Sequence, residues 1–148
     1  MNSGLMCRLL IDTEKAPQFI DITGRVAEHV ELSGVSHGLV CIYSKHTTAS
    51  IKVNENEPLL IEDMERFITR LAPPGDYYAH NDFSVRTVNM TEDECPNGHA
   101  HCQHLIMSSS ETIPVIDGQM ALGTWQRLFL VELDRPRSRE VIVQILGT

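Results

Sequence analysis

The chain has 148 residues, of which 42% are hydrophobic and 22% charged, a composition typical of a globular protein with one sizeable core. Its formal net charge of −8 repels a phosphate backbone and so argues against nucleic-acid binding. No apolar run reaches the roughly 20 residues that a helix needs to span a bilayer, and the N-terminus has no signal-peptide pattern. We therefore expect one domain over residues 1–148, located in the cytoplasm, without a nucleic-acid or membrane partner.

The first half of the chain predicts strands over 5–12, 17–22, 37–44 and 48–54 and a helix over 23–34. The short charged join after the first strand predicts that the first two strands form a hairpin. The strand over 48–54 follows the preceding strand at once, so these two are also expected to pair. Thr23 is suited to cap the helix, and Gly34 to end it.

The second half predicts the clearest helix, between a cap at Asn56 or Glu57 and the pair Pro73–Pro74. Its apolar stripe is expected to pack into the core and consists of Leu60, Met64, Phe67, Ile68 and Leu71. Residues 75–97 are polar and long for a connection, a feature typical of functional loops. A short helix that Asn97 starts and four strand-like runs, with turn signals at Asp117–Gly118 and Pro136, complete the chain. This order predicts an α+β fold of mainly antiparallel β-sheets with two to three helices.

Histidines offer the first candidate chemistry, and those in polar surroundings are His46, His80, His99, His101 and His104. Neutral imidazole is a common ligand of zinc, and a catalytic zinc takes three protein ligands. The segment 97–110 can present two of them, whether it is extended or helical. The third would come from elsewhere, and hydrogen-bonded surface histidines are the alternative. The four cysteines match no zinc-finger spacing and are expected to be free thiols.

Two further stretches offer polar groups. In KHTTASIKVNENE (45–57), an imidazole and two threonine hydroxyls precede an amide and carboxylate run, which suits a polar ligand or a general base. In DRPRSR (134–139), three arginines at alternate positions would share one face of a strand, and their forked donors suit phosphate or carboxylate. The alternatives are turn and cap chemistry for the first stretch and a charged strand edge for the second.

Several motifs together resemble the YjbQ family. They are HTTASIKVNENE (46–57), YYAHND (77–82), NGHAHCQHLIMSSS (97–110) and the block 110–139, which contains Gly-Thr-Trp-Gln. The resemblance covers the chain from about residue 5 to 147. It implies an α+β domain whose sheets pack around a threefold axis as a homotrimer. It also implies the activity of a secondary thiamine-phosphate synthase, which joins a pyrimidine pyrophosphate to a thiazole phosphate and releases pyrophosphate, possibly as a side activity.

The resemblance further implies that His46, His80 and His101 converge on one metal ion, zinc as purified, with magnesium possible beside a pyrophosphate substrate. The other assigned roles are catalytic for Asn54, Glu55, Arg137 and Arg139 and substrate-binding for Thr47, Thr48, Trp125 and Gln126. The extra histidines His99 and His104 lie outside the family pattern, and either could replace one of the three ligands. Two alternatives to the synthase stay open: a zinc-dependent hydrolase with Glu55 as base, and a non-enzymatic trimer that binds a metal or small ligand.

Overall fold

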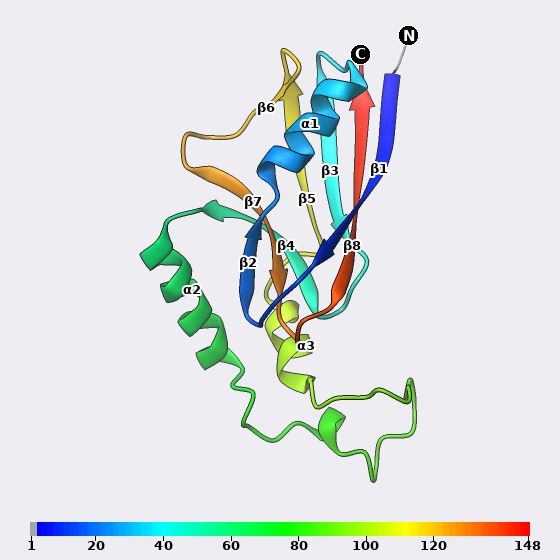
Figure 1. The fold of residues 1–148 in the computed structure, drawn as a ribbon, viewed down its shortest axis with the longest axis vertical. Coiled ribbons are helices and arrows are strands. Elements are labelled where there is room, and N and C mark those ends of the chain that lie inside the picture. The colour runs from blue at the N-terminus through cyan, green and yellow to red at the C-terminus, as the bar shows by residue number, and fades with distance from the viewer. Residues whose placement is uncertain (1–2) are drawn as a thin grey trace.

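The structure, a computed structural model, describes residues 3–148 (Figure 1). Within them, three α-helices and one 3-10 helix accompany eight strands. The elements in chain order are β1 (Ser3–Asp12), β2 (Gln18–Asp21), α1 (Thr23–Ser33), β3 (Gly38–Ser44), β4 (Ala49–Glu55), α2 (Pro58–Leu71), η1 (Ala79–Asn81), α3 (Gly98–Leu105), β5 (Ser110–Ile116), β6 (Gln119–Met120), β7 (Gln126–Glu132) and β8 (Ser138–Gly147).

The strands form two sheets in which every neighbouring pair is antiparallel. One sheet has the order β1-β8-β3-β5-β6 and the other the order β2-β7-β4. The α+β class of antiparallel sheets with helices is therefore confirmed. Both predicted local pairings are wrong, because β1 pairs with β8 and β2 with β7, while β3 and β4 also lie in different sheets. The short connections carry the chain from one sheet to the other instead of folding it back on itself.

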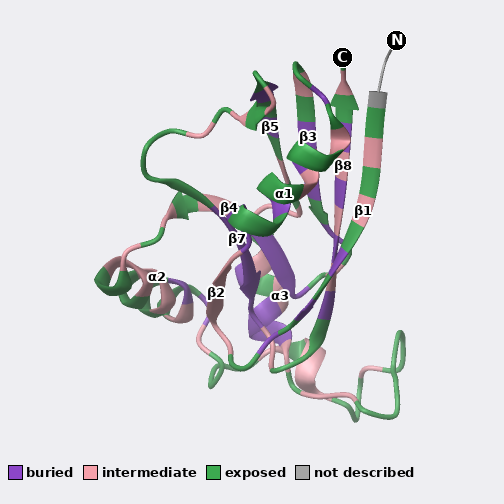
Figure 2. Ribbon diagram, turned by 45° about the horizontal axis from the view of Figure 1, so that its top comes forward, coloured by how far each residue is buried: buried purple, intermediate pink, exposed green. Residues whose placement is uncertain are grey.

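Two apolar clusters hold the layers together. The inner face of the five-stranded sheet packs against α1 and one face of the three-stranded sheet, through residues such as Val26, Val143 and Leu128. The other face of the three-stranded sheet packs against α2 and α3, through residues such as Phe129, Ile68 and Ala100. Strand β7 is consequently buried on both faces, as the purple ribbon in Figure 2 shows.

Helix α1 ends as predicted, since Gly34 adopts a left-handed φ of 67° and its N–H bonds to the Glu31 carbonyl. Its start differs from the prediction. Thr23 lies inside the helix, and its hydroxyl accepts a hydrogen bond from the Leu128 N–H at 2.8 Å. That bond ties α1 to the three-stranded sheet.

Helix α2 starts at the predicted place, because the Glu57 carboxylate accepts hydrogen bonds from the Leu59 and Leu60 N–H groups. The prediction that its whole apolar stripe is buried is wrong. Only Ile68 of the stripe is buried, whereas Phe67 and Leu71 are 55% and 51% exposed. The helix touches the sheet through one edge of the stripe and leaves the rest uncovered (Figure 2).

The connection between α2 and α3 contains only the short η1, yet it is organised by one largely shielded side chain. The Arg86 guanidinium donates to the Glu94 carboxylate at 2.8 Å and to the backbone carbonyls of His80, Val88 and Asn89. This ion pair is largely shielded, because Arg86 and Glu94 are 14% and 16% exposed. The connection extends beyond α3 at the lower end of the molecule in Figure 1.

Asp21, the last residue of β2, bonds to α1, to β7 and to the connection between β4 and α2. Burial raises the pKa of Asp21, but hydrogen bonds from Arg127, Thr23 and Asn56 outweigh it and lower that pKa to about 2. A depressed carboxyl pKa stabilises the fold above the ordinary value of 3.8, and the contribution disappears as the pH falls toward 2.

We expect Asp21→Asn to lower the free energy of unfolding by about 2 kcal/mol at neutral pH, because the charged acceptor of three bonds is lost. Urea denaturation at several pH values checks this, and the deficit should shrink as the pH falls from about 4 to about 2. Asp76→Asn, at an exposed loop position, is the matched control and should change stability by less than about 0.5 kcal/mol. A deficit that does not vary with pH would contradict the prediction.

Candidate functional site

Helix α3 brings two of the predicted metal ligands together. The ring centroids of His80 and His101 lie 4.7 Å apart with an edge-on arrangement, although 21 positions separate them in the chain. The Asn81 side chain accepts a hydrogen bond from the Gly98 N–H at 2.9 Å and so fixes η1 against the start of α3. Burial, followed by the charge of nearby His80, lowers the pKa of His101 and favours its neutral form.

Asp134 connects this histidine pair to the start of β8. Its Oδ2 accepts hydrogen bonds from Asn97 Nδ2 and from Arg137 Nη1, each at 3.1 Å, and the side chain is only 3% exposed. Its negative charge also acts on His101. Asn97 precedes α3 as predicted, but its side chain bonds to Asp134 rather than capping the helix. The site therefore combines two imidazoles, a half-exposed arginine and a buried carboxylate.

His46 stands apart from that pair. It follows β3, and its Nε2 accepts a hydrogen bond from the Glu140 N–H at 2.9 Å. Burial and then the charges of Arg139 and Arg137 lower its pKa. Arg137 bonds to Asp134 and its charge also acts on His46, but nothing in the described residues links His46 directly to His80 or His101.

Arg139 has a structural role in place of the predicted phosphate contact. It is 2% exposed, and it donates to both carboxylate oxygens of Glu132, at 2.7 and 2.5 Å, and to the Thr48 hydroxyl at 2.9 Å. Thr48, predicted to bind substrate, is likewise buried by this contact. The expected row of three arginines on one strand face is also wrong, since Arg135 and Arg137 precede β8. Only Arg137 of the two predicted phosphate ligands is accessible, and Thr47 is exposed.

The remaining predicted residues gather at the opposite end of β4. Glu55 pairs in register with Gln126, and Asn54 with Arg127. Trp125 immediately precedes β7 and is 71% exposed, so it belongs neither to a strand nor to the core. The seven residues of β4 rise about 3.4 Å each, which places this group about 20 Å from the Thr48 end of the strand. Within one chain, the residues of the predicted site therefore lie in two separate groups.

The candidate metal ligands match the needs of a metal ion only in part. His80 and His101 are two neighbouring imidazoles in a polar surrounding, which suits zinc. Among residues 3–148, no three His, Cys, Asp or Glu side chains are already placed to hold one ion. The Nε2 atom of His46 is also engaged by a backbone N–H. The predicted set of three ligands stays a prediction, of which the fold brings two members into contact.

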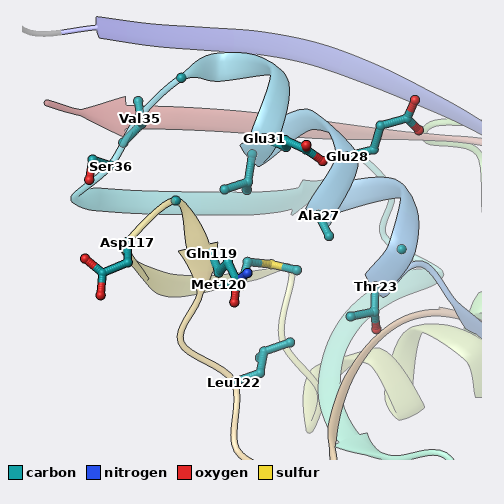
Figure 3. A pocket seen from close by; sticks show the side chains of 14 residues that line it. Thr23, Ala27, Glu28, Glu31, Val35, Ser36, Asp117, Gln119, Met120 and Leu122 are labelled. Atoms are coloured by element: carbon teal, nitrogen blue, oxygen red, sulfur yellow. The ribbon is translucent and has the colours of Figure 1, made fainter.

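A groove with a cavity volume of about 840 Å³ lies elsewhere, between α1 and the β5–β6 turn (Figure 3). Asp117 and Gly118 form that turn with positive φ values of 51° and 77°, as predicted. Glu28, Glu31 and Asp117 line the groove together with apolar residues such as Met120 and Leu122. None of the candidate site residues predicted from the sequence is among the residues that line it.

Residues 8–148 match the family described as "UPF0047 protein YjbQ-like". The chain belongs to the YjbQ family. A UPF0047 protein of Methanothermobacter thermautotrophicus is 35% identical over 139 residues, which span 94% of this chain and 90% of that relative. Another from Archaeoglobus fulgidus is 38% identical over 138 residues, spanning 93% and 98%. The resemblance expected from the motifs is thereby confirmed.

Solved structures of YjbQ-like proteins share the fold. A YbjQ-like protein of unknown function from Sulfolobus solfataricus superposes with a TM-score of 0.89 at 33% identity, and the match covers 100% of both chains. A hypothetical protein from Aeropyrum pernix gives a TM-score of 0.86 at 40% identity, covering 97% and 99%. In the described part of the present chain, no helix is long and apolar enough to cross a membrane.

Three residues of this YjbQ-family site have no role predicted from their sequence context: Arg86, Glu132 and Asp134. Glu132 did carry a signal, because it is a single carboxylate in the apolar run FLVEL, where a buried charge requires a partner. No motif or residue spacing in the sequence indicated a role for Asp134 or Arg86. Their partners lie 37 and 8 positions away in the chain, at Asn97 and Glu94.

Gly98 sets the distance between η1 and α3. A Cβ at this position would lie 2.6 Å from Tyr78 Cβ, so a side chain would push the start of α3 away. We expect Gly98→Ala to lower the free energy of unfolding by about 1–3 kcal/mol in urea denaturation. Gly24→Ala, in α1 where nothing lies within 4 Å, is the control and should be neutral or stabilising. Equal effects of the two substitutions would contradict the steric requirement for glycine at position 98.

Proposed function

We propose that the chain is a metal-dependent enzyme that acts on a small phosphorylated molecule at the His80–His101 pair. The specific reaction proposed is that of the secondary thiamine-phosphate synthases, in which a pyrimidine pyrophosphate and a thiazole phosphate are joined. One new bond links the two precursors, and pyrophosphate leaves with the electron pair of the bond that held it. The observation that carries the proposal is the contact of the two imidazoles, with centroids 4.7 Å apart.

The surroundings of this pair support an anionic substrate. Arg137 is half-exposed beside Asp134, and the positive charge of Arg86 acts on His101. Forked guanidinium donors match the geometry of phosphate oxygens. Arg137 would bind a phosphate and hold it near the imidazoles, while Asp134 fixes the orientation of Arg137 through its hydrogen bond at 3.1 Å. Asp134 therefore acts as a positioning residue.

His80 and His101 would hold the ion, which as a Lewis acid would offset the negative charge of a leaving pyrophosphate. Zinc is the ion that two imidazoles favour, whereas phosphate chemistry commonly uses magnesium. We propose that zinc is bound by the protein and that magnesium arrives with the substrate. Glu55 and Asn54 lie at the opposite end of β4 from Thr48, and we propose that they take no part in this step within one chain.

The test is release of pyrophosphate by purified protein supplied with zinc, magnesium and both thiamine precursors. The expected result is release that requires both precursors together. A double variant, His80→Ala with His101→Ala, prepared identically, measures any contaminating activity. Release that needs only the pyrimidine pyrophosphate would indicate a hydrolase, and release equal to that of the double variant would contradict enzymatic activity of either kind.

We further propose that the chain assembles as a homotrimer through the outer face of the five-stranded sheet. Antiparallel sheets that face water are usually polar on that side. Here the outward residues include Leu39, Tyr43 and Leu146, which are 51%, 44% and 59% exposed, and Leu39 pairs in register with Leu146. Contiguous exposed apolar surface of this kind is typical of protein–protein contacts.

Light scattering coupled to gel filtration is expected to give a mass of three times 16.6 kDa. Leu39→Asp should convert the trimer to monomer, because a charge would be buried at the contact. Leu32→Asp is the matched control, since Leu32 is 68% exposed on α1, away from this face. A mass of one chain for the unmodified protein at micromolar concentration would rule the assembly out.

A further inference from the structure

His80 and His101 are held at the candidate site by different means. His101 lies on α3, which the core anchors through the fully buried Ala100 and through Gln103, whose side chain donates to the Ile68 carbonyl at 3.3 Å. His80 lies on η1, a 3-10 helix of three residues that has no side-chain cap. So short a helical segment is not stable through its own hydrogen bonds. The position of His80 therefore depends on bonds from outside η1.

Two such bonds reach η1 from later parts of the chain. The Asn81 side chain accepts the Gly98 N–H at 2.9 Å, which holds the end of η1 against α3. Arg86 reaches His80 itself, since its Nη1 donates to the His80 backbone carbonyl at 3.5 Å. The Arg86 N–H bonds in turn to the Asp82 carbonyl at 2.9 Å, and this turn carries the arginine side chain back toward η1. The bond to His80 is long, so its strength as a tether depends on how firmly the guanidinium is held.

The guanidinium of Arg86 is held by three further acceptors in the same connection. Nε donates to the Val88 carbonyl at 3.3 Å, Nη2 to the Asn89 carbonyl at 2.7 Å, and Nη1 to Glu94 Oε2 at 2.8 Å. With its donors engaged and its side chain only 14% exposed, Arg86 is not available to bind a phosphate. Arg137 differs in this respect, because its side chain is 38% exposed.

Glu94 supplies the charge that keeps this arrangement closed. Its Oε2 pairs with Arg86, while its Oε1 accepts the N–H and the hydroxyl of Thr91, at 3.1 and 3.2 Å. Removal of one partner of a shielded ion pair leaves the other charge without compensation. The connection would then open to let water reach that charge, and the bond to His80 would be lost with it.

We propose that the Arg86–Glu94 ion pair positions His80 against His101, so that Arg86 is a positioning residue of the candidate site. Its value for metal binding rests on the proposed function, whereas its effect on the two rings does not. When the ion pair is removed, His80 moves with the connection while His101 stays in place on α3. The ring contact, with centroids 4.7 Å apart, is then lost although the sheets remain folded.

The experiment has two measurements. One is the nuclear Overhauser effect between the ring protons of His80 and His101 in histidine-labelled protein, assigned with a His101→Ala variant that must lack it. The other is zinc affinity of chelator-stripped protein, by competition with a chromophoric indicator. The variants are Arg86→Met and Glu94→Gln, which removes only a charge. Arg66→Met is the matched control, because Arg66 is 65% exposed and pairs within α2. Circular dichroism melts report whether each variant is folded.

We expect Arg86→Met to abolish the ring-to-ring signal and to weaken zinc binding about tenfold. Glu94→Gln should act in the same direction by a smaller factor, and it decides the matter if Arg86→Met does not fold. Arg66→Met should change neither measurement.

The outcomes separate this inference from the metal centre. If Arg86→Met and Glu94→Gln keep both the ring-to-ring signal and the zinc affinity of the unmodified protein, the ion pair orders only its own loop and the inference is wrong. Absence of the signal from the unmodified protein would overturn it as well. If the signal is present and Arg86→Met loses it, but the unmodified protein binds no zinc, the positioning role stands and the metal centre fails.

Discussion

Replacing Glu132 by glutamine is expected to lower the free energy of unfolding by about 3–5 kcal/mol, because it leaves the Arg139 charge buried without a counter-ion. Both side chains are almost inaccessible, with exposed fractions of 0% for Glu132 and 2% for Arg139. The Glu132 carboxylate also accepts hydrogen bonds from Thr13 Oγ1 and from the Asp134 N–H. Urea denaturation, followed by circular dichroism, measures the loss.

A double variant removes the ion pair without leaving either charge unpaired. Glu132→Leu combined with Arg139→Met removes both charges, and we expect it to recover much of the stability that the single change loses. The exposed ion pair of Arg66 with Glu62 is the control, and Arg66→Met should cost less than about 1 kcal/mol. A loss below about 1 kcal/mol for Glu132→Gln would show that water reaches Arg139 and would contradict its burial.

Replacing His101 by alanine is expected to abolish both metal binding and turnover. His101 is the member of the imidazole pair that α3 holds in place, and a single remaining imidazole binds zinc only weakly. The measurements are zinc per chain by elemental analysis after purification and the rate of pyrophosphate release. His37→Ala, on an exposed residue away from the site, is the control.

The pattern of losses distinguishes the possible roles of the metal. Loss of zinc together with loss of turnover supports an enzyme. Loss of zinc with only a fall in the stability of the assembly would support a structural ion. Full zinc content in the His101→Ala variant would remove His101 from the ligand set and, with it, the proposed centre.

Local sequence patterns predicted the ends of helices and a turn correctly where neighbouring residues determine them. The end of α1 at Gly34 follows from the left-handed backbone that glycine adopts without a steric cost. The start of α2 follows from Glu57 and Pro58, which act within the first turn. The turn at Asp117–Gly118 follows equally from the positive φ values that these residue types tolerate.

Predictions were wrong where a structural feature depends on residues that are far away in the chain. Strand pairing was wrong for β1 with β2 and for β3 with β4, since any apolar strand can pair with several others and only the assembled layers select the partner. The apolar stripe of α2 was equally ambiguous. Its periodicity says which side chains share a face, but not whether that face meets a sheet of the same chain.

The same distinction between local and distant determinants applies to the site. The chain itself specifies which groups are available: imidazoles at 46, 80, 99, 101 and 104, and arginines at 137 and 139, in motifs specific enough to identify the YjbQ family. Folding assigns them their partners. It joins His80 to His101, buries Arg139 against Glu132 and places Glu55 at the far end of β4. Side-chain chemistry is a property of the residue, whereas burial and proximity arise from contacts between segments that are distant in sequence.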